Sequence, residues 1–301
     1  MVKPNTFIIG AQKAATSSLY YWMSQHPEIC GPSSLKDHPF FLENNHSKKE
    51  IMAFQKEYYR EGYNFQKIIL QGYVNYMFYP EAIKNIYSFN PKAKLICVLR
   101  NPTDRAISAY NYFKKLNLER LSFKEALYKE KDRANGSQRE KNNFTYKAHG
   151  LYAEQLEYIF SIFEKDQVLV LFYEDLQENP YNVLQSIFRF LEVDEQFKAE
   201  LKKVNVTGEV KHKWMHNLLY NQSNIKKFFI DRFIDPILPV HKRTNLKLAF
   251  LNWNTKPKKA GSLTKNDNIK FLEEKKLLNS FFKEDIVKLE KLLNRNLENW
   301  K

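Results

Sequence analysis

The sequence predicts an α/β fold in which a central parallel sheet is flanked by helices in three layers. Two observations support this expectation. Short, continuously apolar runs have the length of strands, and segments with the helical spacing of apolar residues follow them. Strands that are apolar throughout are typical of parallel sheets covered on both faces. The runs lie at residues 6–10, 68–70, 94–99 and 168–173.

Helices are expected where this spacing coincides with start and stop signals. The first, at 16–25, ends before Pro27. A proline in the first turn favours a helix at 80–88, and a capping side chain favours one at 103–115. Further helices are expected at 148–163, 180–191 and 262–300.

The rest of the chain shows less regularity. We expect one domain over residues 1–301, within which 195–250 lacks the alternation and is expected to be an insertion or a lid. The polar stretch NGSQREKNN, residues 135–143, has the composition most typical of disorder.

Charge and cysteine content limit the classes of function. The formal net charge is +14, which suits nucleic acid, membrane surfaces or acidic small molecules as partners. The lysines are scattered, so a lysine-rich composition explains the charge equally well. No apolar run approaches the roughly 18 residues of a membrane helix. Cys30 and Cys97 lie in or beside apolar segments, so we expect a reduced, cytoplasmic protein with no disulfide framework and no membrane partner.

A candidate anion site lies in the stretch FIIGAQKAATSSL, residues 7–19. A strand ends at Gly10, and small and hydroxylated residues follow Lys13 into a helix. Helix N-termini with free amides bind anions, and a lysine adds charge. The ATP-binding pattern places glycine and lysine where Ala15 and Thr16 stand here, so the loop is P-loop-like but not of the ATP type. An ordinary capped helix with an exposed lysine is the alternative.

A second candidate cluster follows the strand KLICVL. Arg100 lies at the carboxyl end of that strand, where open α/β sheets bind ligands. On the next helix Asp104 and Ser108 share a face, while Arg105 points elsewhere. Arg100 and Ser108 can therefore hold a phosphate together. The alternative is a local pair between Arg100 and Asp104.

Together the two clusters resemble the sulfotransferases that use 3′-phosphoadenosine 5′-phosphosulfate (PAPS), most closely the bacterial and heparan-sulfate-type branch. That family has a K-x-G-T-[TS]-x-L loop and an R-x-P-x-D-R-x-x-S-x-Y segment. Here they read KAATSSL from Lys13 and RNPTDRAISAY from Arg100. The second match is complete, and the first departs at Ala15, where glycine is usual. The segments 150–160, 168–180 and 252–300 also resemble the family.

The resemblance implies a role for each matching residue. Lys13 would stabilise the bridging oxygen that gains charge, and Arg100 and Ser108 would hold the 3′-phosphate. The backbone and hydroxyls of the loop would hold the 5′-phosphate, and two lysines near the C-terminus match the family's basic positions. These are Ala14, Ala15, Thr16, Ser17 and Ser18 in the loop, and Lys256 and Lys258. Adenosine 3′,5′-bisphosphate (PAP) would be the product, and no metal is expected because no cluster has ligand spacing.

The acceptor side matches the family less well. Its general base lies in a K-E-x-H-F-F segment, which here reads KDHPFF from residue 36. Asp37 replaces glutamate, and His38 competes with it as the base. A second family segment, E-A-S-P-x-Y, retains only Tyr76. The resemblance implies acceptor contacts for Phe41, Tyr76 and Tyr152.

The predicted function is therefore sulfuryl transfer from PAPS to a hydroxyl or amine of a carbohydrate or a small natural product. Two other classes stay open. One is a P-loop kinase for a nucleoside or small molecule, against which the misplaced Lys13 argues. The other is a non-enzymatic polyanion binder that uses the net charge of +14; nucleic acid is the less expected partner.

Overall fold

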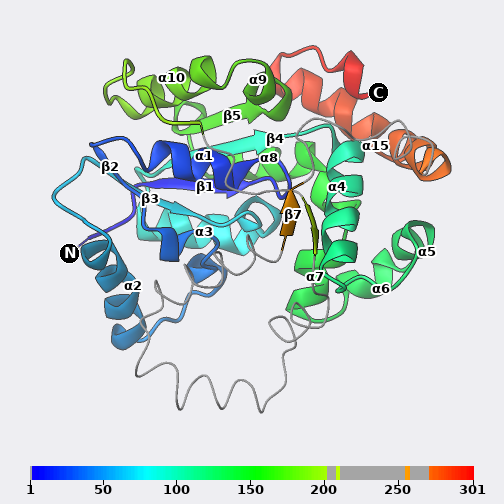
Figure 1. Cartoon of the computed structure of the whole chain (residues 1–301), viewed down its shortest axis with the longest axis horizontal. Helices are drawn as coiled ribbons and strands as arrows, with labels where there is room; N and C mark the ends of the chain where they lie inside the picture. Colours follow the sequence, from blue (N-terminus) through cyan, green and yellow to red (C-terminus); the bar gives the residue numbers. More distant parts are fainter. Residues whose placement is uncertain (1, 202–207, 211–254, 258–270) are drawn as a thin grey trace.

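A five-stranded parallel sheet forms the centre of the protein (Figure 1). The computed structural model describes residues 2–201, 208–210, 255–257 and 271–301. The order of the strands across the sheet is β2-β3-β1-β4-β5. Their bounds are Thr6–Gly10 for β1, Ile29–Cys30 for β2, Ile68–Gly72 for β3, Lys94–Leu99 for β4 and Val168–Phe172 for β5. The predicted parallel α/β fold is confirmed, with β2 as a short strand that the sequence analysis missed.

The central strand β1 is buried along its whole length. All of its residues, TFIIG, are buried, as expected for a strand with neighbours on both edges and layers on both faces. It pairs with β3 from Thr6 opposite Leu70, and with β4 from Thr6 opposite Lys94. The apolar content of β1 and β4 therefore follows from their place in the sheet.

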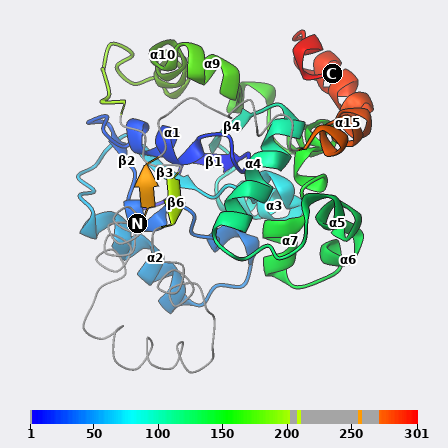
Figure 2. The same cartoon turned by 45° about the vertical axis from the view of Figure 1, so that its right-hand side comes forward.

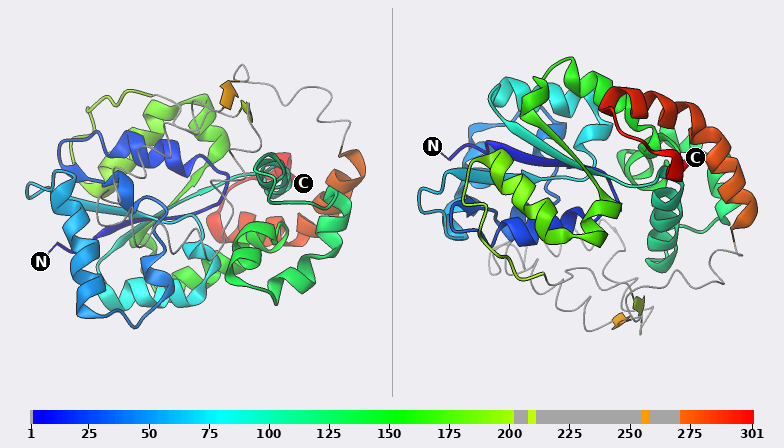
Figure 3. Two further views of the ribbon diagram at one scale, coloured as in Figure 1. Left: turned by 60° about the horizontal axis from the view of Figure 1, so that its bottom comes forward. Right: turned by 90° about the horizontal axis from the view of Figure 1, so that it is seen from above.

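Helices cover both faces of the sheet (Figure 3). On one face lie α1 (Thr16–Met23) and α10 (Pro180–Leu191), and on the other lie α3 (Pro80–Phe89) and α8 (Tyr152–Phe160). The helix α4 (Pro102–Lys115) extends from the carboxyl end of β4. The predicted helices 80–88, 103–115 and 180–191 are thus present within one residue of their expected ends.

Three helices that the sequence analysis missed begin with the same capping arrangement. These are α2 (Lys48–Arg60), α5 (Phe123–Tyr128) and α7 (Gln138–Phe144). Each follows a serine whose side chain accepts from the amide three residues on, while the glutamate there bonds back to the serine. This capping box satisfies two amides that would otherwise lack partners. The expectation of disorder at 135–143 is therefore wrong, because Ser137 and Glu140 start a helix. The short helices α6 (Glu130–Ala134) and α9 (Tyr173–Glu178) complete the set between β4 and α10.

The C-terminal helix α15 spans Leu272–Leu293 and packs on α8. It is shorter than the predicted 262–300, because Asn294 adopts a left-handed φ of 48° that ends it. Asp285 accepts from the amides of Tyr152 and Ala153 at 2.9 and 3.2 Å, so α15 caps the start of α8. Within the described ranges no helix is long and apolar enough to cross a membrane.

Little of the predicted insertion at 195–250 can be assessed. Residues 202–207 and 211–254 lie outside the described part of the chain. The strand β6 (Gly208–Val210) pairs antiparallel with β7 (Thr255–Pro257) (Figure 2).

Candidate active site

The candidate site lies where the carboxyl ends of β1 and β4 meet. These strands are neighbours, yet α1, which follows β1, and α8, which lies in the connection from β4 to β5, cover opposite faces of the sheet. Ligands of open α/β sheets bind in the crevice at such a switch point. The amide of Ala11 donates to the carbonyl of Val98 at 2.8 Å. This bond aligns the loop that carries Lys13 with the segment that carries Arg100.

The loop after β1 turns sharply and leaves its amides free. Lys13 and Ala15 have positive φ angles of 69° and 64°. Ala15 is the N-cap of α1 and makes no side-chain cap. In the described structure, the amides of residues 15–18 have no hydrogen-bond partner. The helix is therefore not capped by a side chain in the ordinary way, and its free amides are arranged as at helix N-termini that bind anions.

Ala15 adopts the backbone conformation that glycine would supply. A φ of 64° is left-handed, and such a position disfavours a side chain with a Cβ. Alanine stands here in place of the family's usual glycine, yet the backbone of the loop keeps the geometry that a glycine would adopt. The methyl group remains as local strain beside the anion site.

The side chain of Lys13 lies in a strongly cationic and partly buried place. Its Nζ stands 3.9 Å from the centroid of the Tyr112 ring. Burial lowers the pKa of Lys13 to about 8, and the charges of Arg100, Lys115 and Arg105 add to the effect. Asp37 opposes the shift. A neighbouring anion would restore the charge of this lysine.

Arg100 is bonded to the same loop. Its Nη1 donates to the carbonyl oxygen of Lys13 at 3.1 Å, and its guanidinium stacks 4.5 Å from the ring centroid of Tyr173. Among the described residues no ion pair joins Arg100 to Asp104, so the alternative of a local pair is not what the structure contains. Ser108 and Asp104 are both half-buried along one side of α4.

Arg105 lies inside the protein and forms no ion pair with a described carboxylate, although the charge of Glu130 acts on its pKa. It is 0% exposed, and its Nη2 donates to the carbonyl of Tyr146. Its Nε and Nη1 have no hydrogen-bond partner in the part of the chain that the structure describes. Lys13 and Arg100 likewise form no ion pair with a described carboxylate. The chain therefore gathers three cations that an anionic ligand can neutralise, and the residues present fit a nucleotide with several phosphates.

The charge of Asp37 acts on Lys13 and raises the pKa of that lysine. Asp37 donates its amide to the carbonyl of Gly72 at 2.7 Å, and its side chain is 47% exposed and paired with Lys36. Its φ is 66°, a conformation that aspartate and asparagine adopt more readily than glutamate. This backbone gives a physical reason for the shorter carboxylate at this position.

His38 has a different set of neighbours. Its ring centroid lies 5.8 Å from that of Phe54 on α2. The residue keeps exposed surface, but partial burial of its ring lowers the pKa, as does His46, while Glu57 opposes the shift. The charges that act on His38 thus come from α2 and the turn before it. Asp37, in contrast, is among the charges that act on Lys13.

The three residues expected to contact the acceptor are buried. Phe41, Tyr76 and Tyr152 are 3%, 0% and 0% exposed. The hydroxyl of Tyr76 donates to the carbonyl of His38 at 3.1 Å, and that of Tyr152 donates to the carbonyl of Arg100 at 3.0 Å. Direct contact with the acceptor therefore stays a prediction, and in this structure the two tyrosine hydroxyls bond to backbone carbonyls of the site.

A polar cluster that sequence reasoning missed lies beside these residues. Tyr73 follows β3 directly, and its hydroxyl oxygen accepts from Asn142 Nδ2 at 3.1 Å and from Asn75 Nδ2 at 3.4 Å. Asn142 lies on α7, and its carbonyl oxygen also accepts from Gln12 Nε2 at 2.9 Å. The position of Tyr73 at the end of a strand was the available signal, since ligand contacts gather there.

The remaining predicted residues fall outside these contacts. Lys256 lies in β7, opposite Glu209. Lys258 lies outside the described residues.

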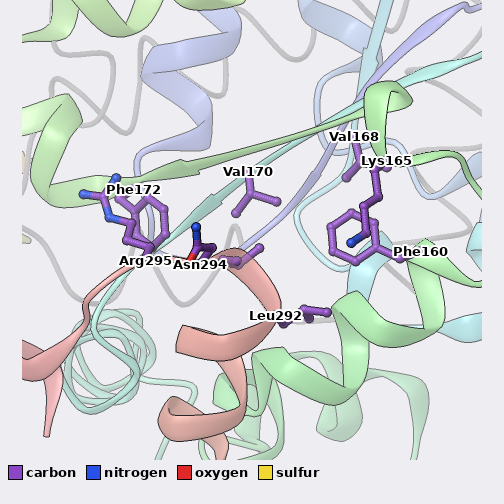
Figure 4. A pocket seen from close by; sticks show the side chains of 9 residues that line it. Phe160, Lys165, Val168, Val170, Phe172, Leu292, Asn294 and Arg295 are labelled. Atoms are coloured by element: carbon purple, nitrogen blue, oxygen red, sulfur yellow. The ribbon is translucent and has the colours of Figure 1, made fainter.

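A cavity of about 480 Å³ lies elsewhere, between β5 and the end of α15 (Figure 4). None of the predicted site residues lines it. It is lined by Phe160, Lys165, Val168, Val170, Phe172, Leu292, Leu293, Asn294 and Arg295. Arg295 is paired with Asp175 at 2.7 and 2.9 Å, so its charge is already compensated.

The fold and the cationic loop define a P-loop-like α/β protein whose loop suits a phosphorylated ligand and lacks the ATP-type lysine. The family model described as "Sulfotransferase domain" matches residues 3–234. The chain belongs to the sulfotransferase family.

Relatives and solved structures agree with this assignment. The chain is 24% identical to the "Membrane-associated sulfotransferase kil1" of Dictyostelium discoideum, over 76% of this chain and 63% of that protein. It is 27% identical to the "Bifunctional heparan sulfate N-deacetylase/N-sulfotransferase 4" of Mus musculus, over 63% of this chain and 22% of that protein. The crystal structure of a sulfotransferase from Alicyclobacillus acidocaldarius is similar with a TM-score of 0.68 and 26% identity, covering 100% of this chain and 99% of that one.

Proposed function

We propose that the protein transfers a sulfuryl group from PAPS to a hydroxyl or amine of a saccharide or small-molecule acceptor. The observation that carries the proposal is the bond from Arg100 to the carbonyl of Lys13, within a group of cations that form no ion pair with a described carboxylate. The membership of the family supports the same chemistry. The chain spans 63% and 22% of the two curated relatives above, so the activity and the substrates are proposals for this chain.

Each residue has a stated part in the step. Asp37 takes the proton of the acceptor as the acceptor atom forms its bond to sulfur. Lys13 donates toward the bridging oxygen as the bond from sulfur to that oxygen breaks and charge develops there. The amides of residues 15–18, with Thr16 and Ser17, hold the 5′-phosphate, and Arg100 with Ser108 holds the 3′-phosphate.

We assign the base to Asp37 rather than to His38. Asp37 acts on the pKa of Lys13, whereas the charges that act on His38 are those of His46 and Glu57. A base has to reach the acceptor that the donor group faces, so the carboxylate on the Lys13 side fits that requirement.

We also propose a cytoplasmic location. Cys30 and Cys97 are free and buried, as in proteins that are kept reduced.

Calorimetry with PAP, with adenosine 5′-monophosphate and with ATP plus magnesium tests the class of ligand. We expect PAP to bind more tightly than either of the others. Preference for ATP with magnesium would favour a kinase, and binding only to an oligonucleotide would favour a polyanion binder. Incubation with labelled PAPS and a panel of sugars, phenols and amines, read by mass spectrometry, then identifies the acceptor.

A further inference from the structure

The hydroxyl of Tyr73 is surrounded by donors. Asn142 Nδ2 approaches it at 3.1 Å and Asn75 Nδ2 at 3.4 Å. A tyrosine oxygen has one hydrogen to donate and otherwise accepts. Asn75 turns its Nδ2 toward this oxygen and leaves its own Oδ1 buried without a partner. Because both described neighbours donate in this arrangement, the hydrogen of Tyr73 has no acceptor among the described residues. Tyr73 as a whole is 9% exposed, so little of the residue is in contact with solvent.

The amide of Asn142 is held in the orientation that produces this arrangement. Its Oδ1 accepts from the hydroxyl of Tyr79 at 2.5 Å and from Gln138 Nε2 at 3.1 Å. Two donors on that oxygen leave Nδ2 as the atom that faces Tyr73. Gln138 also donates to the oxygen of Tyr79 at 2.6 Å, which fixes the direction of the whole network.

Tyr73 stands close to the reacting groups. Its amide donates to the carbonyl of Ile8 in β1 at 3.0 Å, and the preceding residue, Gly72, accepts from the amide of Asp37 at 2.7 Å. Burial raises the pKa of Tyr73, and the charge of Asp37 adds to that shift. The hydroxyl therefore stays protonated and remains a donor beside the proposed base.

We propose that Tyr73 donates a hydrogen bond to the attacking atom of the acceptor, and that this donor selects a hydroxyl over an amine. The inference rests on the proposed function. A hydroxyl oxygen has four tetrahedral positions: carbon, a hydrogen, and two lone pairs. Asp37 takes the hydrogen, one lone pair bonds to sulfur, and the other accepts from Tyr73. All four positions are then satisfied, and the acceptor is oriented for attack.

An amine fits the same three partners less well. Its nitrogen has two hydrogens and a single lone pair, which has to bond to sulfur. The fourth position is therefore an N–H, and it meets the O–H of Tyr73, donor against donor. A site that is built to hydrogen-bond one group discriminates against the analogue that leaves its buried donor unpaired.

The test compares 2-naphthol with 2-naphthylamine as acceptors, because they have the same ring system and differ in the attacking atom. Hydrolysis of PAPS is a third readout, in which water is the acceptor. We expect the unmodified protein to prefer naphthol. Tyr73→Phe should lower transfer to naphthol, and to water, by about tenfold or more, and should change transfer to the amine by less than about threefold. The ratio of the two rates should fall accordingly.

A second variant separates this role from a structural one. Asn142→Asp keeps an oxygen for Tyr79 and Gln138 but turns the group facing Tyr73 into an acceptor, which captures its hydrogen. It should reproduce the changed ratio with the hydroxyl still present. Tyr128→Phe removes an exposed hydroxyl on α5, where Tyr128 is 69% exposed, and is the matched control.

The outcomes separate the two proposals. PAP affinity is measured for every variant and should stay within about threefold, because none of them touches the cation group. Failure of the unmodified protein to bind PAP would overturn the proposed function. Normal PAP binding with an unchanged naphthol-to-amine ratio in both Tyr73→Phe and Asn142→Asp would overturn the role of Tyr73 alone. No release of PAP from PAPS with any of the three acceptors would count against the proposed function.

Discussion

The guanidinium of Arg100 donates to the carbonyl of Lys13 at 3.1 Å, across 87 residues of sequence. The residue proposed for the 3′-phosphate thus also fixes the loop proposed for the 5′-phosphate. The two subsites are one bonded unit, so a change at one alters the other.

Arg100→Ala should therefore weaken the binding of two nucleotides unequally. PAP should lose about 2–3 kcal/mol of binding free energy, since a charge-assisted contact to the 3′-phosphate is removed. Adenosine 5′-monophosphate should lose about 0.5–1 kcal/mol, because the carbonyl of Lys13 loses its donor. Calorimetry measures both, and an equal loss for the two nucleotides would show that Arg100 does not contact the 3′-phosphate.

The low pKa of Lys13 predicts proton uptake on binding. In the free protein its pKa is about 8, and a bound phosphate raises it again. Above pH 8 part of the protein must therefore take up a proton to bind PAP, and affinity should fall as the pH rises through 8. Calorimetry at pH 8.5 in two buffers of different ionisation enthalpy detects the uptake.

The control for this prediction is Lys13→Arg, which stays charged and should abolish the proton uptake.

The lowered pKa of Lys13 also affects the stability of the folded protein. Between the pKa of about 8 in the folded protein and the ordinary 10.5, the unfolded chain holds more protons, so stability without nucleotide should rise with pH across that window. For the binding prediction, heats of PAP binding at pH 8.5 that do not depend on the buffer would contradict the low pKa assigned to Lys13.

Asp37→Asn should lower turnover by about a hundredfold or more, which is a typical contribution of a positioned base. Asparagine suits the left-handed φ of 66° at least as well as aspartate, so folding and PAP binding should be retained. His38→Ala should lower turnover by less than about threefold. The reverse pattern in initial rates would make His38 the base. Asp37→Glu is expected to retain activity but to lose stability, because glutamate tolerates this backbone less well.

Ala15→Gly should stabilise the protein. Removing the Cβ from a residue with φ of 64° relieves about 1–2 kcal/mol, offset by the greater freedom of glycine in the unfolded chain. A rise in melting temperature of about 1–3 °C is expected. Ala14→Gly is the control, because Ala14 is 0% exposed and has no positive φ; it should lower the melting temperature. A lower melting temperature in Ala15→Gly would contradict the strain.

The buried charge of Arg105 should contribute to nucleotide affinity although it touches no solvent. Arg105→Met should weaken PAP binding by about fivefold to thirtyfold, which corresponds to about 1–2 kcal/mol. It should not lower the melting temperature of the free protein as a lost ion pair would, because Arg105 has no such pair among the described residues. Unchanged PAP affinity would place Arg105 outside the electrostatics of the site.

The strands were predicted well because their signal is local. The run 94–99 coincides with β4, since buried parallel strands are apolar without interruption. The cofactor-side residues were also within reach, because Lys13 and Arg100 each follow a strand whose end marks a ligand position.

The missed helices had a local signal as well. The patterns SKKE, SFKE and SQRE each begin a helix with a capping box, and in 135–143 the polar composition obscured this signal. No local sequence pattern predicts the hydrogen-bond network of Tyr73 and Asn142, because these residues lie 69 positions apart. Likewise, the burial of Tyr76 and Tyr152 depends on packing between distant elements rather than on their own neighbours.

The central place of β1 in the sheet has a consequence for synthesis on the ribosome. This strand is made first, yet its partners β3 and β4 begin at residues 68 and 94. At about 5–20 residues per second, its apolar side chains wait several seconds for the first partner. The start of α8 waits longer for its cap, since Asp285 is translated 133 residues after Tyr152. A nascent chain of this protein therefore exposes early a strand that is fully buried in the folded sheet, which makes it a natural client for chaperones that hold unpaired strands.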